Sequence, residues 1–381
     1  MFEIRVVCFL LVNVTCLLFV TADDVAAQIR MNEIQVIGTH NSYHLAPHPT
    51  VMRLIAQRQE SLAQSLDYTH RPLSEQFGQL GIRQIELDIY ADPAGGLYAK
   101  PLMAKQVADG RHDPKGTLQR PGLKVLHIQD IDYRTTVFTL VDALQQVRSW
   151  SRKNPQHVPI LIMLEVKQQP IGNEFTRPHP FGKSEFDSID REILSVFEPA
   201  EILKPDDVRG DHESLRSAVT QRGWPDLDDV RGKVMFALDN EGALRDSYLL
   251  GYPALRGRLL FVSVDESHEA AAFMKLNDPI GDFRKIQDAV QKGYLVRTRA
   301  DSGTRQARLN DRTQAEKAFA SGAQFISTDY PEPDHRLSHY RVVFPRSVVA
   351  RGNVVNADAV WHVQEFDSSC ERPAVKSQLS D

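Results

Sequence analysis

IQVIGTHNSY, residues 34–43, is the stretch of sequence that decides the fold class. Its first half is apolar and rich in β-branched side chains, which predicts a strand buried on both faces. A doubly wound, open α/β sheet would carry a glycine-rich phosphate-binding loop directly after such a first strand. Here that place is taken by residues 38–43, GTHNSY, which have a different and more polar pattern. The stretch therefore favours a closed barrel over an open sheet.

Short apolar runs recur along the chain, and stretches with helical periodicity separate them. The runs predicted as strands are 34–38, 82–90, 124–128, 160–166, 234–238, 259–264, 294–297 and 325–328. The predicted helices are 52–66, 140–153, 185–197, 215–222, 283–292 and 314–321. Alternation of this kind indicates right-handed βαβ units and a parallel sheet. Eight strands in this length predict an α/β fold, a single (β/α)8 TIM-type barrel, regular or distorted, with a C-terminal extension.

The first 27 residues fit a signal peptide. A basic side chain at Arg5 precedes an apolar run, and the small residues at 25–27 place signal peptidase cleavage before Gln28. An uncleaved membrane anchor is the alternative, but the apolar stretch is barely long enough to span a bilayer. We therefore expect a secreted or periplasmic protein with no integral membrane segment after cleavage. Its parts would be a signal peptide at 1–27, a catalytic barrel at 28–340 and a C-terminal extension at 341–381, packed on the barrel or partly disordered.

The composition is that of an ordinary globular protein, with 42% hydrophobic and 25% charged residues among 381. Lys and Arg number 45 against 50 Asp and Glu, and this mildly acidic balance gives no case for nucleic-acid binding. Cys370 is the one cysteine outside the expected signal peptide. An intrachain disulfide, a zinc–thiolate site and a cysteine nucleophile are therefore excluded for the mature chain.

Carboxylates gather at the predicted strand ends, where barrels of this type hold their active sites. Glu86 and Asp88 are two residues apart and share a face on a strand, and Glu165 ends the fourth predicted strand. Buried carboxylates without partners are costly, and like charges raise each other's pKa. Together with the amide oxygen of Asn41, the three form an all-oxygen set that suits calcium. The alternative is an ion-pair network with a nearby cation: Arg83, Lys124 or Lys167.

Two histidines, His40 and His127, flank these carboxylates at predicted strand ends. Their positions predict acid–base work or phosphate contact, and zinc binding is the competing use. We expect three further histidines to be structural or to lie at the rim: His44, His48 and His70. We expect Asp130 and Asp132, which follow His127, to be solvated in a loop, although they could enlarge the acidic mouth.

Several motifs occur in an order that resembles the catalytic barrel of phosphoinositide-specific phospholipase C. The motifs at the strand ends are GTHNSY at 38–43, ELD at 86–88, LH at 126–127 and LEVK at 164–167. Further similar stretches are 68–73, 150–159, 296–301 and 327–331. The resemblance spans most of the mature chain and is strongest to the secreted, calcium-dependent bacterial-type branch. The metal-independent branch, in which an arginine replaces the metal, lacks the carboxylate set that this sequence retains.

The resemblance implies a calcium-dependent phosphodiesterase that cleaves phosphatidylinositol-type lipids to diacylglycerol and inositol phosphate. The implied calcium ligands are Asn41, Glu86, Asp88 and Glu165. In the implied mechanism the inositol 2-hydroxyl attacks its own phosphodiester. His40 would contact the phosphoryl oxygens, His127 would protonate the departing diacylglycerol, and Glu86 would take the hydroxyl proton.

Headgroup binding is expected from Lys167, Arg297 and Arg299, whose positive charges suit phosphate. Asp329 is expected to orient Arg297. The segment at 350–355 follows the closing pattern of the family only loosely, and a lipid-binding accessory domain is not evident. We therefore expect a monomer whose barrel itself meets a phosphoinositide lipid at a membrane surface.

Two alternatives stay open. Glycerophosphodiester phosphodiesterases are also barrels with a Glu-x-Asp metal pair, but they carry His-Arg where this chain has His40 and Asn41. The other is a secreted pseudoenzyme that binds phosphoinositides without turnover, although no expected ligand or histidine is missing from this sequence.

Overall fold

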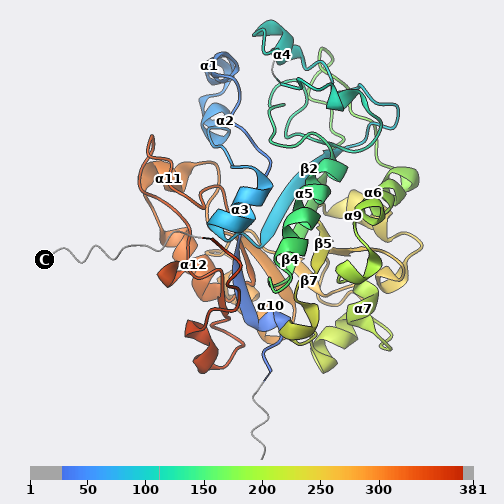
Figure 1. Ribbon diagram of the computed structural model, residues 1–381, viewed down its shortest axis with the longest axis vertical. Coiled ribbons are helices and arrows are strands. Elements are labelled where there is room, and N and C mark those ends of the chain that lie inside the picture. Colours follow the sequence, from blue (N-terminus) through green and yellow to red (C-terminus); the bar gives the residue numbers. More distant parts are fainter. Residues whose placement is uncertain (1–27, 111, 372–381) are drawn as a thin grey trace, which may run out of the picture.

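A parallel β-sheet that curls into a nearly closed barrel is the centre of this computed structural model, which describes residues 28–110 and 112–371 (Figure 1). The barrel strands are β1 (Ile34–Thr39), β2 (Gln84–Tyr90), β4 (Ile160–Val166), β5 (Val234–Leu238), β6 (Leu260–Val262), β7 (Phe273–Lys275), β8 (Leu295–Arg299) and β9 (Phe325–Thr328). Neighbouring strands pair in the order β6-β5-β4-β2-β1-β9-β8-β7, and each of these pairs is parallel. The predicted (β/α)8 class is confirmed.

A weak seam lies between β6 and β7. Each of these strands has three residues, and an isolated parallel bridge from Ser263 to Phe273 joins them. Residues 263–272 connect the two strands without a helix, so the regular alternation of strand and helix fails at this point. The barrel is therefore of the distorted kind.

The predicted strand at 124–128 is wrong as a barrel strand. β3 (Lys124–Val125) pairs antiparallel with the end of β2 and lies off the path of the barrel strands. The strand that completes the barrel is β7, which the sequence pattern does not predict because a three-residue run is too short to show a period. The number of strands is thus as predicted, while one of them lies elsewhere in the chain.

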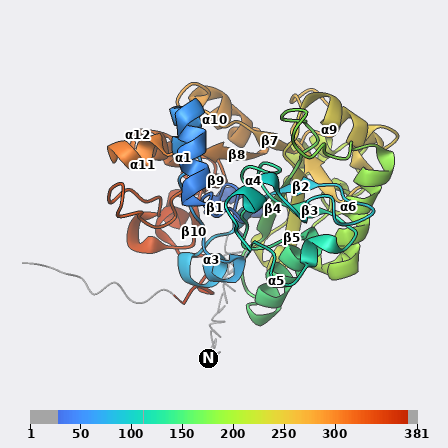
Figure 2. The same cartoon turned by 90° about the horizontal axis from the view of Figure 1, so that it is seen from above.

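Helices cover the outside of the barrel and extend from its rim (Figures 1 and 2). They are α1 (Pro49–Arg58), α2 (Glu60–Ser65), α3 (Leu73–Leu80), α4 (Leu102–Gln106), α5 (Leu140–Lys153), α6 (Lys183–Val196), α7 (Pro205–Arg209), α8 (Leu215–Ser217), α9 (Gly242–Leu249), α10 (Phe283–Gln291), α11 (Arg305–Leu309) and α12 (Thr313–Ser321). Short 3-10 or π turns are η1 (Met31–Glu33), η2 (Thr117–Gln119), η3 (Pro199–Glu201), η4 (Ala218–Arg222), η5 (Leu227–Val230), η6 (Pro253–Leu255), η7 (Pro345–Ser347) and η8 (Ala359–Val363). The predicted helix at 52–66 is divided into α1 and α2, because Gln59 between them is extended, with φ −153°.

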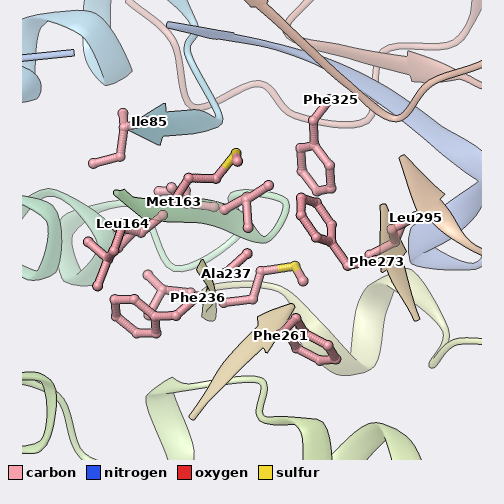
Figure 3. Close-up of a cluster of buried hydrophobic side chains, with 14 of the residues drawn as sticks. Ile85, Met163, Leu164, Phe236, Ala237, Phe261, Phe273, Leu295 and Phe325 are labelled. Carbon is pink, nitrogen blue, oxygen red and sulfur yellow. The ribbon is translucent and has the colours of Figure 1, made fainter. Parts of the chain in front are cut away.

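The barrel interior has an apolar floor with a polar layer beyond it. The floor includes buried side chains from several strands (Figure 3): Met163, Ala237, Phe261, Phe273, Leu295 and Phe325. Two residues further along the chain, on the same strands or directly after them, are Glu165, Asp239, Ser263, Lys275, Arg297 and Ser327. Burial of the floor stabilises the barrel, and the polar layer at the carboxyl ends of the strands supplies the candidate site.

Two segments rise past the carboxyl ends of the strands. α1 and α2 follow β1, and α4 lies in the long connection after β2 (Figure 1). Between the segments lies a cavity of about 700 Å³, whose lining includes Leu45, Met52, His112 and Phe138. None of the polar-layer residues lines this cavity, so the cavity and the polar layer are distinct features of the barrel mouth.

The segment after the last barrel strand returns to the barrel. β10 (Ala350–Gly352) pairs antiparallel with β1, and Asp367 forms a buried ion pair of 2.7 Å with Arg83. The predicted signal peptide at 1–27 and the last part of the predicted extension, 372–381, lie outside the described residues. In the part of the chain that is described, no helix has the length and apolar character needed to cross a membrane.

Candidate active site

Three carboxylates come together at the carboxyl ends of neighbouring strands. Glu86 and Asp88 lie on β2, and Glu165 lies on β4 directly opposite Asp88 in the strand register. Oxygens of the three side chains lie within 4.8 Å of one another. Glu86 and Asp88 are buried, whereas Glu165 is half-buried. The parallel pairing of β2 with β4 thus brings the three carboxylates predicted as ligands into one cluster.

Asn41 reaches this neighbourhood from the loop after β1. Ser42 ties that loop to β2, because its N–H donates to the Glu86 carbonyl and its hydroxyl accepts from the Glu86 N–H, both at 2.9 Å. Asn41 has φ 43°, a left-handed conformation that asparagine adopts more readily than most residues. Its amide N–H donates to the Tyr68 hydroxyl (3.1 Å), while its buried Oδ1 has no hydrogen-bond partner among the described residues. A buried oxygen of this kind is available to a metal ion.

Burial and crowding oppose full ionisation of the cluster. Burial raises the pKa of Glu86 to about 8; Arg297 opposes this rise, and the neighbouring acids add to it. Burial also raises the pKa of Asp88 to about 8, with Lys167 opposing the rise and Glu165 adding to it. A cation bound among these oxygens would favour the ionised forms.

The donor set fits a hard divalent cation. It consists of carboxylate oxygens and one amide oxygen, and Oδ1 of Asp88, like Oδ1 of Asn41, has no hydrogen-bond partner in the described part of the chain. Calcium accepts oxygen sets of this type and completes its shell with water or substrate oxygens. Zinc and other softer metals favour imidazole or thiolate ligands, which this cluster does not contain.

Lys167 places a positive charge inside the cluster. Its Nζ lies 3.1 Å from Asp88 Oδ2 and 3.1 Å from Glu165 Oε1. The charges of these acids raise the pKa of the lysine although burial opposes the rise. Of the three cations considered as partners, Arg83 and Lys124 instead pair with acids outside the cluster.

Arg297 and Arg299 contact different acids. Arg297 is buried on β8 and donates to Glu86 Oε2 (2.5 Å) and to Asn277 Oδ1 (2.6 Å). Arg299 donates to Asp329 Oδ2 (2.9 Å). The expectation that Asp329 orients Arg297 is therefore wrong, because the register of β8 against β9 brings the end of β9 level with Arg299.

His40 bridges the cluster and Asp329. Its Nδ1 lies 2.8 Å from Asp329 Oδ1, and its Nε2 lies 3.6 Å from Glu86 Oε1. Burial lowers the pKa of His40 to about 3; Arg299 adds to the fall and Asp329 opposes it. The ring is therefore neutral at neutral pH. Because a carboxylate only accepts, Nδ1 carries the hydrogen and Nε2 presents a lone pair.

His127 lies in the loop after β3 and not at the end of a barrel strand, because β3 is an antiparallel strand outside the barrel path. The Tyr90 hydroxyl, at the end of β2, donates to the His127 carbonyl (3.0 Å) and fixes this loop. Nδ1 of His127 lies 2.7 Å from Asp132 Oδ2. The side chains of His127 and His40 are 19% and 20% exposed, so each ring has one nitrogen on a buried carboxylate and an accessible edge.

His44 and Asp132 are fully buried, so His44 is a structural residue and not a rim residue, and the expectation that Asp132 is solvated in a loop is wrong. His44 Nε2 lies 2.8 Å from Asp132 Oδ2, the oxygen that also faces His127. Burial opposes ionisation of Asp132, but its contacts with the two imidazoles hold its pKa at about 2. His44 and Asp132 are 88 residues apart, and no local pattern in the sequence signals this contact.

Other polar residues near the mouth support the loops. His70 Nε2 lies 2.9 Å from the His40 carbonyl, and His48 accepts from the Thr50 N–H at the start of α1. Asp130, expected to be solvated, is instead buried and accepts from backbone N–H groups.

An ion pair that the sequence does not single out completes the polar layer. Lys275 Nζ, at the end of β7, lies 2.9 Å from Asp239 Oδ2, which follows β5. The sequence could have indicated this pair only if β7, which carries Lys275, had been predicted.

Comparison with known proteins identifies a family. A family model described as "Phosphoinositide phospholipase C, Ca2+-dependent" matches residues 29–354. No curated protein matches the chain.

Similar solved structures include a calcium-dependent phosphoinositol-specific phospholipase C from Pseudomonas sp., with 15% identity, TM-score 0.47, and 85% of this chain and 95% of that chain covered. A Ca2+-dependent phosphatidylinositol-specific phospholipase C from Streptomyces antibioticus has 16% identity and TM-score 0.46, with 79% of this chain and 95% of that chain covered. A glycerophosphoryl diester phosphodiesterase from Parabacteroides distasonis has 11% identity and TM-score 0.29, with 80% of this chain and 86% of that chain covered. Since the family model spans most of the chain, the resemblance inferred from the motifs is confirmed. The chain belongs to the calcium-dependent phosphoinositide phospholipase C family and is an enzyme of that class.

Proposed function

We propose that the chain is a calcium-dependent phosphodiesterase that cleaves phosphatidylinositol-type lipids to diacylglycerol and inositol phosphate. One observation carries the proposal: oxygens of Glu86, Asp88 and Glu165 lie within 4.8 Å of one another, and His40 contacts this cluster. Membership of the family supports the class of reaction. The calcium requirement, the roles of the residues and the order of bond changes are parts of the proposal.

The calcium ion would be held by the oxygens of Asn41, Glu86, Asp88 and Glu165. When bound, calcium supplies a fixed positive charge near the phosphodiester and lowers the pKa of a neighbouring hydroxyl. Lys167, Arg297 and Arg299 are proposed to bind the diester and the headgroup. Each of them is paired with an acid in the protein, so the substrate would share or replace those partners.

His40 is proposed as the group that takes the proton from the inositol 2-hydroxyl. Its Nδ1–H donates to Asp329, which leaves the Nε2 lone pair free to accept. A bound phosphodiester would oppose the effect of the nearby arginines and raise the pKa of His40, which strengthens the base. This differs from the assignment of that proton to Glu86, whose Oε2 already accepts from Arg297.

His127 is proposed as the general acid. The 2-oxygen forms a bond to phosphorus while the bond from phosphorus to the diacylglycerol oxygen breaks, and His127 Nε2 gives its proton to that departing oxygen. Asp132, on Nδ1, fixes the direction of the ring. The first product is a cyclic phosphodiester, which water opens in a later step. Each acid or base contributes about 10²- to 10⁴-fold to the rate.

We further propose that 1–27 is a signal peptide, that 28–340 is the catalytic barrel, and that 341–381 is an extension. The protein would be a secreted or periplasmic monomer that acts at a membrane surface. The intact mass of the exported protein tests the processing, with a mature chain that begins at Gln28 as the expected result.

Phosphorus NMR of the products from phosphatidylinositol micelles, with calcium and with a chelator, tests the function. The expected result is the signal of a cyclic inositol phosphate that forms with calcium and not with the chelator. Turnover of glycerophosphocholine without turnover of phosphatidylinositol would identify a glycerophosphodiester phosphodiesterase instead. Lipid binding without turnover under both conditions would identify a pseudoenzyme.

A further inference from the structure

His44 and His127 both contact the same oxygen of Asp132, and their rings meet edge to face with centroids 5.6 Å apart. Nε2 of His44 lies 2.8 Å from Asp132 Oδ2, and Nδ1 of His127 lies 2.7 Å from the same oxygen. A carboxylate only accepts, so both nitrogens donate hydrogen to it. The other oxygen, Oδ1, is buried and has no hydrogen-bond partner among the described residues. The two imidazoles therefore set the orientation of this carboxylate.

The position of His44 is itself fixed. The side chain is fully buried, and its ring stacks on Tyr68 with centroids 4.2 Å apart. Nδ1 lies 3.1 Å from the Tyr68 carbonyl, and the backbone N–H donates to the Asn41 carbonyl (2.8 Å). Within residues 28–110 and 112–371, no lysine or arginine lies within 4.0 Å of the Asp132 carboxylate. A buried carboxylate needs hydrogen-bonding or positively charged partners, and the two side chains that contact the Asp132 carboxylate are both histidines.

We propose that His44 is a positioning residue for departure of the leaving group, acting through Asp132 on His127. The inference rests on the proposed function, in which His127 protonates the departing oxygen. Without the His44 contact, the Asp132 carboxylate can rotate and offer its other oxygen, so that the His127 ring loses its fixed direction. His44 does not touch the reacting atoms in this scheme.

A metal ion is the competing use of the same cluster. Ligand atoms of His44, His127 and Asp132 lie within 4.8 Å of one another. The His127 and His44 nitrogens lie 2.7 and 2.8 Å from Asp132 Oδ2, and these are hydrogen-bond lengths. In a zinc site each of these atoms would instead lie about 2.0–2.2 Å from the metal ion. The contacts in the protein are therefore those of a hydrogen-bonded triad.

The test compares two substrates that differ in their need for a general acid. The oxygen that leaves from phosphatidylinositol is that of an alcohol and needs a proton, whereas p-nitrophenyl inositol phosphate releases p-nitrophenolate, a stable anion that departs without one. His44→Phe should lower kcat on phosphatidylinositol about 10- to 100-fold, by analogy with residues that orient the ligands of a metal ion. It should change kcat on the nitrophenyl substrate less than about threefold, because that step does not use the acid. His44→Gln, which can keep one N–H toward Asp132, should recover most of the loss.

His157→Phe is the matched control. His157 is fully buried and makes two contacts of 2.7 Å, with Ser151 Oγ and with the Val158 carbonyl. It precedes the amino end of β4, whereas the candidate site lies at the carboxyl ends of the strands. Its substitution should leave the ratio of the two rates unchanged even if stability falls.

Three outcomes would overturn the inference. Equal loss on both substrates in His44→Phe and His44→Gln would show a general structural role. Unchanged rates on both would show no role, and stoichiometric zinc binding that His44→Phe abolishes would show a metal site. If the wild-type protein turned over neither substrate, the proposed function itself would fail, which is a distinct result.

Discussion

Charged side chains in the barrel mouth occur as pairs of opposite sign. The pairs are Glu86 with Arg297, Asp88 with Lys167, Asp239 with Lys275, and Asp329 with Arg299. Removal of one partner from a buried pair leaves an uncompensated charge, which costs about 3–5 kcal/mol. Substitutions in this layer therefore alter stability as well as chemistry.

Asp88→Asn should weaken calcium binding. The substitution removes one negative charge from the cluster and replaces one ligand oxygen by an amide nitrogen, so the calcium dissociation constant measured by calorimetry should rise by about tenfold or more. Glu192→Gln is the control, because Glu192 is partly buried outside the cluster and accepts from the Leu123 N–H. An unchanged calcium titration for Asp88→Asn would remove this residue from the ligand set.

His127→Ala should abolish most turnover of phosphatidylinositol without changing calcium affinity. His127 is bonded to Asp132 and is not one of the clustered carboxylates, so its loss removes the general acid and should cost about 10²- to 10⁴-fold in kcat. Turnover and calcium calorimetry on the same preparation check both parts. Near-normal turnover would contradict the assignment of the acid.

At the level of elements, the barrel is closed most weakly at its seam. β6 and β7 are the shortest of the barrel strands and share one isolated bridge. Amides of Leu260–Val262 should therefore exchange hydrogen faster than amides of Ile160–Val166 in β4, which pairs along its length with β2 and β5. Mass-spectrometric hydrogen exchange measures this difference, and equal protection would show that the seam is not a weak point.

The segment that follows β10 is fixed to the barrel by a buried ion pair. Arg83 donates to both oxygens of Asp367, at 2.7 and 3.0 Å, and both side chains are fully buried. Asp367→Ala should lower the free energy of unfolding by about 3–5 kcal/mol, because the guanidinium stays buried without its partner. Urea denaturation measures the change.

Turnover per folded molecule provides the control for this variant. Arg83 precedes β2, whereas Glu86 and Asp88 lie further along that strand toward its carboxyl end. The kcat of folded Asp367→Ala should therefore remain near the wild-type value, and a large loss would show that the extension also shapes the site.

At the scale of the whole molecule, calcium should stabilise the protein more at high pH than at low pH. Burial raises the folded-state pKa of Glu86 and Asp88 to about 8 from ordinary values of 4.5 and 3.8. Between those limits the folded protein holds protons that the unfolded chain has lost. Without calcium, the stability that these groups contribute is present at low pH and is lost as the pH rises toward 8.

Calcium binds the ionised carboxylates and must displace those protons at low pH. The rise in Tm on calcium addition should therefore be larger at about pH 8 than at about pH 5.5. At a free calcium concentration about 100 times the dissociation constant, the stabilisation should reach about 2.7 kcal/mol. Differential scanning fluorimetry with calcium or chelator checks this, and a shift that is independent of pH would contradict the proton displacement.

Local sequence was sufficient for the parts of the fold that depend on periodicity. The strands at 160–166 and 234–238 and the helix at 140–153 have the predicted bounds, because their apolar runs are long enough to show a period. The same reasoning placed Glu86 and Asp88 on one face of β2. Periodicity did not predict the strand at Phe273–Lys275, because the run has only three residues. It also did not show that Lys124–Val125 pairs antiparallel with β2 and lies outside the barrel.

The chain by itself determined the barrel class and the set of carboxylates at its mouth, because parallel strands with period-two side chains bring their carboxyl ends to one rim. Only the tertiary structure decided which groups meet there. The contact of His44 with Asp132 spans 88 residues, and that of His40 with Asp329 spans 289. Such contacts depend on the paths of loops over the barrel and on strand register, which are set by packing of distant segments and leave no local pattern in the sequence.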